Sequence, residues 1–198
     1  LLQFMTTNES IWTYKGTTEL DGNITCKVDN NFEKVNETWY TFNRNYTEIK
    51  TKNYRSMRAE LLVTKGNRYV SQSLCSAMVA TDETGASTLE VLIFQTDNQS
   101  CGVFYILPLR GAQKEDRDVL LTEDDFYCEL RVKDSITSKP SSLPQKNDKL
   151  VIINRQPPQE CLNAYSLHCT QRSKGGDKQV YFPRCKASQK AVPRKKRQ

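Results

Sequence analysis

The chain has 198 residues, of which 37% are hydrophobic and 9% aromatic, with only 8 glycines, a composition that excludes fibrous and low-complexity proteins. This length suits one full-sized domain or two small ones. The formal net charge is +6, but six basic residues and no acid follow Cys185, so the rest of the chain is near neutral and is not typical of a nucleic-acid-binding protein.

Eight segments in which apolar and polar residues alternate with period two predict β-strands. They lie near residues 10–18, 23–30, 37–45, 57–64, 72–80, 87–95, 101–109 and 126–133. Turn-forming pairs such as Asp21-Gly22 and Thr84-Gly85 separate several of them. Consecutive strands with short links form an antiparallel meander, which loses its edges by closing into a barrel. We therefore expect an all-β, eight-stranded antiparallel barrel over about residues 10–133.

The character of the chain changes after the last strand. Residues 134–149 are rich in Ser, Lys and Pro and predict an exposed linker. Pro157-Pro158 then favours a helix over about 158–170, on which Cys161 and Cys169 share a face. These cysteines are too far apart to bond each other, so we expect them to attach the helix to the outside of the barrel wall. Residues 179–182 predict a last extended segment.

We expect residues 1–185 to form one domain and residues 186–198 to form a disordered basic tail. Binding to heparan-type glycans and a basic processing site are the other interpretations of this tail. Residues 1–5 are too short for the apolar region of a signal peptide, so we expect the signal to have been removed, with its end retained at most. No apolar run approaches the length of a membrane span, so we expect none.

Cysteines and sequons both indicate the secretory pathway. The seven cysteines include no C-x-x-C pair, and His168 is the only histidine, so we expect no metal and no other cofactor. Scattered cysteines are typical of a disulfide framework in a secreted protein. Five Asn-x-Ser/Thr sequons predict glycosylation, at Asn8, Asn23, Asn36, Asn45 and Asn98. We therefore expect a secreted, extracellular glycoprotein.

Two other classes of protein fit the sequence poorly. Cys26 and Trp39 are spaced as in an immunoglobulin-like domain, but neither Cys75 nor Cys101 has a tyrosine two residues earlier. Nothing in the chain matches a catalytic motif of a hydrolase, metalloprotease or P-loop enzyme, and we expect His168 to lie on the surface. We therefore expect a container and not an enzyme.

Four segments in the second half of the chain carry a family resemblance through their order and spacing. They are Cys101-Gly-Val-Phe-Tyr-Ile-Leu, Tyr127-Cys128-Glu129-Leu130, Pro158-x-x-Cys161-x-x-x-Tyr165-x-x-x-Cys169 and Val180-Tyr181-x-x-x-Cys185. Together they resemble the salivary lipocalins of ticks, the group that includes the histamine-binding proteins, with a japanin-like branch as one placement. The resemblance implies disulfides that leave Cys75 unpaired, namely Cys26–Cys185, Cys101–Cys169 and Cys128–Cys161. It also implies a secreted protein that binds a small ligand and modulates host immunity.

The resemblance and the alternation together predict which side chains face the inside of the barrel. If Cys101 and Cys128 face outward to the helix, their alternate neighbours face inward. The expected ligand-binding residues are Trp39, Tyr40, Phe42, Leu62, Leu92, Phe94, Phe104, Ile106, Tyr127, Glu129 and Arg131, where Trp39 is an alternative to the pair Tyr40 and Phe42. Glu60 and Glu90 are further candidate carboxylates.

The charged residues among these bear on the ligand. A protonated amine leaves water only for an anion or an aromatic face, and Glu129 is the candidate anion. Arg131 on the same face partly neutralises it, so a mostly apolar lining favours a lipid with one polar end: a sterol, fatty acid or eicosanoid. Two alternatives stay open, a scavenger of histamine or serotonin and an immune modulator whose outer surface binds a host complement component or immune-cell receptor. We expect a monomer.

Overall fold

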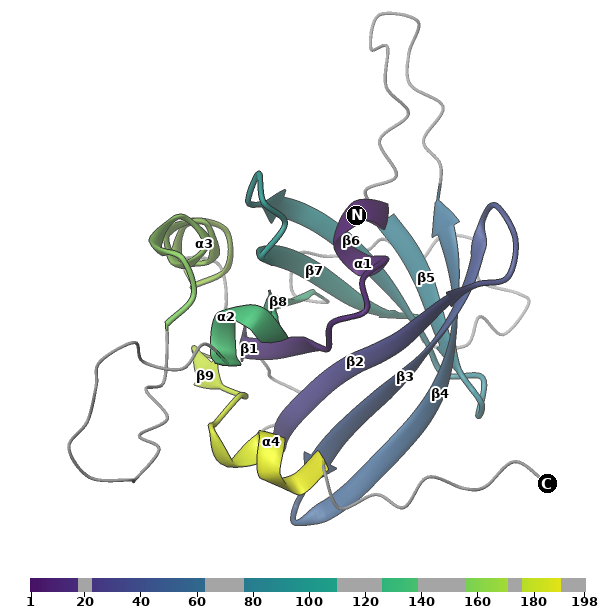
Figure 1. Ribbon diagram of the computed structural model, residues 1–198, viewed down its shortest axis with the longest axis horizontal. Helices are drawn as coiled ribbons and strands as arrows, with labels where there is room; N and C mark the ends of the chain where they lie inside the picture. Colours follow the sequence, from purple (N-terminus) through teal and green to yellow (C-terminus); the bar gives the residue numbers. More distant parts are fainter. Residues whose placement is uncertain (18–22, 63–76, 110–125, 139–155, 171–175, 190–198) are drawn as a thin grey trace, which may run out of the picture.

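The computed structural model describes residues 1–17, 23–62, 77–109, 126–138, 156–170 and 176–189. Eight antiparallel strands, each paired with the next, form one sheet that closes where β1 pairs with both β8 and β2 (Figure 1). The strands are β1 (Ile11–Thr17), β2 (Ile24–Lys34), β3 (Trp39–Glu48), β4 (Thr51–Leu62), β5 (Ala77–Asp82), β6 (Ser87–Gln95), β7 (Cys101–Leu109) and β8 (Tyr127–Lys133). The predicted eight-stranded barrel is confirmed.

The hairpin between β3 and β4 is longer than the alternation predicts. Its register runs without interruption from Trp39↔Glu60 to Glu48↔Thr51, so β4 begins six residues before the predicted 57. The two turn residues, Ile49 and Lys50, both have positive φ, 43° and 71°. Asn and Gly are the usual residues of such a turn, and their absence here explains why the sequence does not reveal it.

The first residues of the chain pack against the barrel. Leu2–Met5 form a short helix, α1, and Leu1, Phe4 and Met5 are buried. The Phe4 ring lies 5.6 Å from that of Phe104 inside the barrel. Apolar packing therefore holds α1 over the end of the barrel near the start of β7 (Figure 1).

The predicted linker is helical where it begins. Asp134–Ser138 form α2, and the Asp134 carboxylate accepts a hydrogen bond of 2.8 Å from the indole of Trp12. The rest of the predicted linker, from residue 139, lies outside the described residues. A tertiary contact with β1 thus orders residues whose composition alone favours a loop.

The predicted helix over 158–170 is present as α3 (Gln159–Tyr165) followed by a π-helical turn (Ser166–Thr170). It lies outside the barrel, against β7 and β8 (Figure 1). β9 (Lys178–Gln179) and α4 (Arg184–Gln189) follow. The predicted disordered tail therefore begins with helical residues, and its remainder, from residue 190, lies outside the described residues.

Three disulfides connect the C-terminal segments to the barrel, and two of the implied pairings are wrong. Cys26–Cys185 is as the resemblance implies, but Cys101 bonds Cys161 and Cys128 bonds Cys169. Cys161 and Cys169 lie about 12 Å apart along the helix, and Cys101 and Cys128 lie about 13 Å apart along the paired strands. Because the two distances match, only the direction of the helix decides the pairing. The hydroxyl of Tyr105, opposite Cys128, donates to the carbonyl of His168, which places the C-terminal end of the helix beside Cys128.

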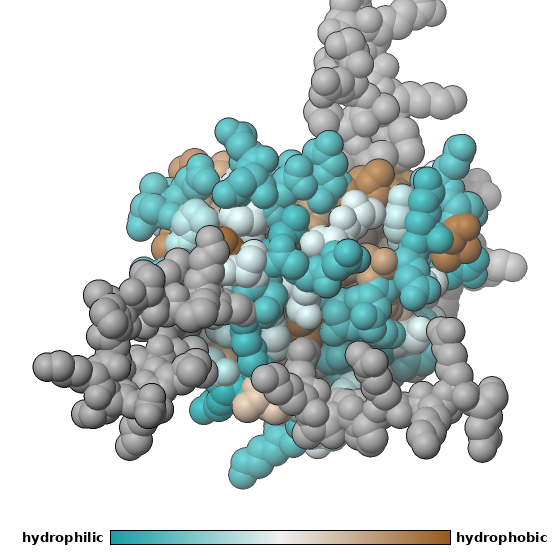
Figure 2. Space-filling view, in the orientation of Figure 1, coloured by the Kyte–Doolittle hydropathy of each residue, from teal (hydrophilic) through white to brown (hydrophobic). Residues whose placement is uncertain are grey.

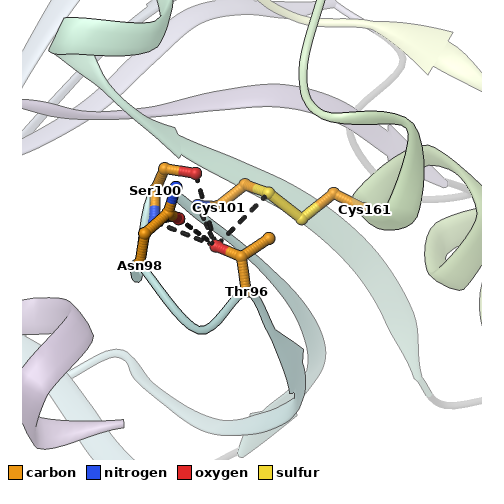
Figure 3. Close-up of a disulfide and its surroundings, with 5 residues drawn as sticks. All are labelled: Thr96, Asn98, Ser100, Cys101 and Cys161. Carbon is orange, nitrogen blue, oxygen red and sulfur yellow. Dashed lines mark hydrogen bonds between the residues drawn. A yellow bond between two sulfur atoms is a disulfide. The ribbon is translucent and has the colours of Figure 1, made fainter.

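The loop before β7 holds Cys101 in place for its bond to α3 (Figure 3). The Thr96 hydroxyl donates to Asn98 Oδ1 at 2.8 Å and accepts the backbone N–H of Ser100 at 3.0 Å. Thr96 and Ser100 are buried, so these polar groups satisfy each other within the loop. Cys75, implied to be unpaired, lies outside the described residues.

Two apolar clusters lie on opposite sides of the barrel wall. The inner cluster contains Tyr40, Phe42, Met57, Ala59, Leu61, Met78, Ala80, Phe104 and Ile106 with the side chains of α1. The outer cluster joins Trp12, Tyr14, Val103, Leu130 and Val132 to Cys161, Tyr165, Cys169 and Tyr181. The face shown in Figure 2 is mostly hydrophilic with scattered apolar side chains. Among the described residues, no helix is long and apolar enough to cross a bilayer.

Candidate functional site

β7 and β8 place their predicted residues inside the barrel. Phe104 and Ile106 belong to the inner cluster, and Tyr127 packs against it. Cys128 and Leu130 belong to the outer cluster, so Glu129 between them faces inward, as does Arg131. These positions follow the predicted alternation; contact with a ligand stays a prediction.

β3 and β4 separate the predicted aromatic and aliphatic residues. Tyr40 and Phe42 are buried in the inner cluster, whereas Trp39 points outward, where the Arg58 guanidinium lies 4.4 Å from its ring. Leu62 is 37% exposed. On β4 the inward residues are Met57, Ala59 and Leu61, so Leu62 and Glu60 face outward, and the prediction that they line the interior is wrong. Adjacent Leu61 and Leu62 make this strand apolar on both faces, which hides its register.

A bulge in β6 moves Phe94 to the outside. Leu92 pairs with Phe104 and packs on the inner cluster, but the register then shifts and Phe94 pairs with Val103. Val103 faces outward, and Phe94 accordingly packs on the outer cluster. Strict alternation places Phe94 inside with Leu92, so this prediction is wrong because one extra residue reverses the faces.

Six buried charged side chains cross the middle of the barrel interior, and we call them the charged belt. Lys27 and Asp29 come from β2, Arg44 from β3, Glu90 from β6, and Glu129 and Arg131 from β8. Each is at most 7% exposed, and Glu90 is fully buried. Buried charges are stable only when they are paired.

The contacts within the belt form one continuous network. Arg44 donates two hydrogen bonds of 2.8 Å to the Asp29 carboxylate and one of 2.8 Å to Glu90. Arg131 contacts Glu90 at 2.6 Å and Glu129 at 2.6 Å. Lys27 forms an ion pair with Glu129 on the other side. Three cations therefore balance three anions.

The network shifts the pKa values of its members. Burial by itself raises the pKa of Glu129, but the charges of Lys27 and Arg131 outweigh it and lower this pKa to about 2. In the same way Arg131 and Arg44 outweigh burial and hold the pKa of Glu90 far below its usual range. Both carboxylates are therefore ionised at neutral pH.

Lys27 shows the opposite balance. Burial lowers the pKa of its ammonium group, the Glu129 carboxylate opposes this, and the cations of Arg44 and Arg131 lower it further. The lysine end of the belt therefore disfavours additional positive charge.

Aromatic rings cover the two arginines. The Arg131 guanidinium carbon lies 4.5 Å from the centre of the Phe104 ring, and that of Arg44 lies 5.3 Å from Phe42. Each Nη atom of Arg131 contacts a carboxylate at 2.6 Å, Nη1 that of Glu90 and Nη2 that of Glu129. Because a guanidinium carries five N–H donors, the belt still has donors for a polar group that reaches it from the apolar interior.

A small cavity adjoins the Lys27–Glu129 ion pair. It has about 30 Å³ of space and is lined by Thr13, Gly16, Ile24, Lys27, Tyr127, Glu129, Lys178 and Val180. Thr13 donates a weak hydrogen bond of 3.4 Å to Glu129. A volume of this size holds about two water molecules.

Sequence reasoning missed Lys27, Asp29 and Arg44. The predicted strand over residues 23–30 ends at Asp29-Asn30-Asn31, a sequence typical of a turn, whereas β2 continues to Lys34. Arg44 follows Tyr40 and Phe42 at the same two-residue spacing, and Lys27 precedes Asp29 in the same way. The alternation of a longer β2 and β3 was therefore the available signal.

The model of the family described as tick histamine binding protein matches residues 2–187. The chain belongs to this family. No curated protein matches the chain. The closed barrel and the family together make this a salivary lipocalin of the ligand-binding kind, and proteins of the family are secreted. The family and fold are those of lipocalin binding proteins, which are typically not enzymes.

Proposed function

We propose that this lipocalin carries a small amphipathic lipid with an uncharged or acidic polar end, and not a biogenic amine. The charge balance of the belt is the observation that carries the proposal. The three buried carboxylates, Asp29, Glu90 and Glu129, already have cationic partners from the chain itself.

An amine fits this interior poorly. Its ammonium group loses hydration on burial and needs an unpaired carboxylate or an open aromatic face in return. The described carboxylates of the belt are paired, and the faces of Phe42 and Phe104 are covered by arginines. Displacing one belt cation leaves it buried without a partner, which costs about 3 to 5 kcal/mol.

A lipid fits better because its two ends match the two parts of the interior. The inner cluster, with Tyr40, Phe42, Leu92 and Phe104, is the apolar part. The guanidinium of Arg131 has five N–H donors, more than its contacts with Glu90 and Glu129 use, and it can donate to a hydroxyl or carboxylate. Ligand sites of this kind are mostly apolar with a few polar groups that orient the ligand.

The biological part of the proposal rests on the family and the sequons. We infer that the protein is secreted in tick saliva as a glycosylated monomer and sequesters a host lipid or lipid mediator, which dampens immune responses. Asn8, Asn23, Asn36 and Asn98 are exposed, and Asn45 is half-buried on the outer face of β3, so each site is compatible with an attached glycan.

Native mass spectrometry of the secreted protein, followed by organic extraction, tests the proposal. The expected result is a retained lipid, or stoichiometric uptake of cholesterol, hexadecanoic acid or an eicosanoid by the stripped protein, with no uptake of histamine or serotonin. Stoichiometric binding of histamine by a protein that takes up none of these lipids would overturn it.

A further inference from the structure

The barrel has a seam between β1 and β2. The two strands pair only at Ile11↔Asp29 and Trp12↔Val28. Beyond these pairs β1 has an irregularity between Thr13 and Lys15, and Cys26 on β2 adopts a left-handed conformation with φ of 55°. The strands therefore separate toward the end of the barrel where β1 ends and β2 begins.

Residues 176–185, which we call the strap, fill this seam. Val180 bridges the two strands, since its N–H donates to the Tyr14 carbonyl at 3.0 Å and its carbonyl accepts the Cys26 N–H at 2.8 Å. Lys178 and Gln179 continue the ladder along β1. The strap thus takes the place of the missing β1–β2 pairs.

Both ends of the strap are anchored. At one end Asp177 accepts a hydrogen bond from the Tyr165 hydroxyl at 3.2 Å and pairs with Lys15 at 2.5 Å. At the other end Cys185 is bonded to Cys26. Gly176, the first residue of the strap, has a φ of 77°, a conformation that glycine adopts without strain.

The cavity beside the charged belt lies behind the strap. Its walls come from β1, β2 and β8, and the strap contributes Lys178 and Val180. The residues that line it include two lysines, Lys27 and Lys178, and one carboxylate, Glu129. The formal charge of the lining is therefore positive, unlike that of the balanced belt.

We propose that the cavity behind the strap binds the carboxylate of an acidic lipid, with Lys178 of the strap and Lys27 of β2 as its cationic sides. This inference rests on the proposed lipid-carrying function and identifies the polar end of the ligand and its site. The lowered pKa of Lys27 agrees, because burial first and the cations of Arg44 and Arg131 after it disfavour the charged ammonium, and an added anion favours it.

The size of the cavity agrees with a head group and not a whole ligand. A carboxylate has about the volume of the two waters that the cavity holds, whereas an acyl chain is far larger. Ile24, Tyr127 and Val180 are the less polar walls. Tyr127 also packs on the inner cluster, so an acyl chain passing it reaches the apolar interior.

Titration calorimetry with hexadecanoic acid and methyl hexadecanoate tests the site. The free acid is expected to bind about tenfold more tightly than the ester, since a hydrogen-bonded charge contact is worth about one such factor. Lys178→Met keeps the aliphatic stem and removes the charge, and we expect it to weaken the acid about tenfold and leave the ester unchanged. Lys34→Met, at an exposed position on β2, is the matched control and changes neither affinity.

The outcomes separate the site from the function. Equal affinities for acid and ester, or an unchanged acid-to-ester ratio in Lys178→Met, overturn the carboxylate site and leave the lipid-carrying function standing. Uptake of neither lipid by the wild-type protein overturns both. If Lys178→Met unfolds, judged by its thermal transition, Lys178→Gln replaces it with the same expected loss of acid preference.

Discussion

The two faces of β7 and β8 show how one pair of strands serves two purposes. On the outer face Cys101 bonds α3, Cys128 bonds the π-helical turn after it, and Leu130 packs in the outer cluster, so the contacts are apolar and covalent. On the inner face Glu129 and Arg131, one residue away along β8, belong to a buried ionic network. The outer face attaches the helix and supports the fold, and the inner face selects what the barrel holds. Each prediction below tests whether these roles are separate.

The largest expected effect is the loss of an inner charge. Arg131→Met leaves Glu90 and Glu129 each without one cationic contact inside the barrel, and we expect the free energy of unfolding to fall by about 3 to 5 kcal/mol. Urea unfolding measures it. Arg58→Met, which removes only the outward contact with Trp39, is the control and costs less than about 1 kcal/mol. Equal losses in the two variants would show that the belt is not a stabilising network.

Acid should reduce the contribution of the inner face to stability, because the ionised carboxylates lie there, and leave that of the apolar outer face unchanged. The folded-state pKa of Glu129 is lowered to about 2, below its unfolded value, so its stabilisation is present above about pH 5 and is lost as the pH falls toward 2. The contribution is about 3 kcal/mol. Urea unfolding at a series of pH values measures it, and Glu129→Gln should flatten the acidic limb. If the free energy of unfolding of Glu129→Gln falls as steeply with decreasing pH as that of the wild type, the lowered pKa of Glu129 is contradicted.

A smaller effect should follow from changing the shape of a belt cation while keeping its charge. Arg44→Lys loses the two-pronged contact with Asp29 and keeps only a point charge, so we expect a loss of about 1 to 2 kcal/mol. Thermal and urea unfolding measure it. Arg55→Lys is the control and should change stability little, because Arg55 is only half-buried and its ion pairs with Asp82 and Glu83 are long, 3.8 Å and 3.4 Å. If Arg44→Lys leaves the stability unchanged, the charge at this position stabilises the belt and the two-pronged geometry does not.

The smallest effect separates the two faces on one strand. Leu92→Ala shortens an inward side chain and should weaken lipid binding several-fold, whereas Phe94→Ala, beyond the bulge, should leave it unchanged. Displacement of a bound fluorescent fatty acid measures both affinities. If Phe94→Ala binds the lipid more weakly than Leu92→Ala, the ligand lies on the outer face of β6 and not inside the barrel.

Local pattern in the sequence was sufficient for the eight barrel strands, for the helix that carries Cys161 and Cys169, and for most faces of the strands. Alternation depends on neighbours two residues apart, so it correctly placed Phe104, Ile106 and Glu129 inside the barrel. The same rule failed at Phe94, where the bulge reverses the faces, and at Leu62, where both faces of β4 are apolar. It failed over β2 because Asp29 and its neighbours resemble a turn, which concealed Lys27 and Asp29 from the predicted site.

The sequence by itself determined an all-β meander of eight strands, a helix carrying two cysteines on one face, and the family. The tertiary structure alone decided which cysteines bond, because helix and strand spacings match in either direction and only the direction of α3 against β7 and β8 separates the two pairings. It also decided the charged belt and the strap. Lys27 meets Glu129, and Tyr14 meets Val180, across more than 100 residues of chain, so these contacts exist only once the barrel has closed in one register.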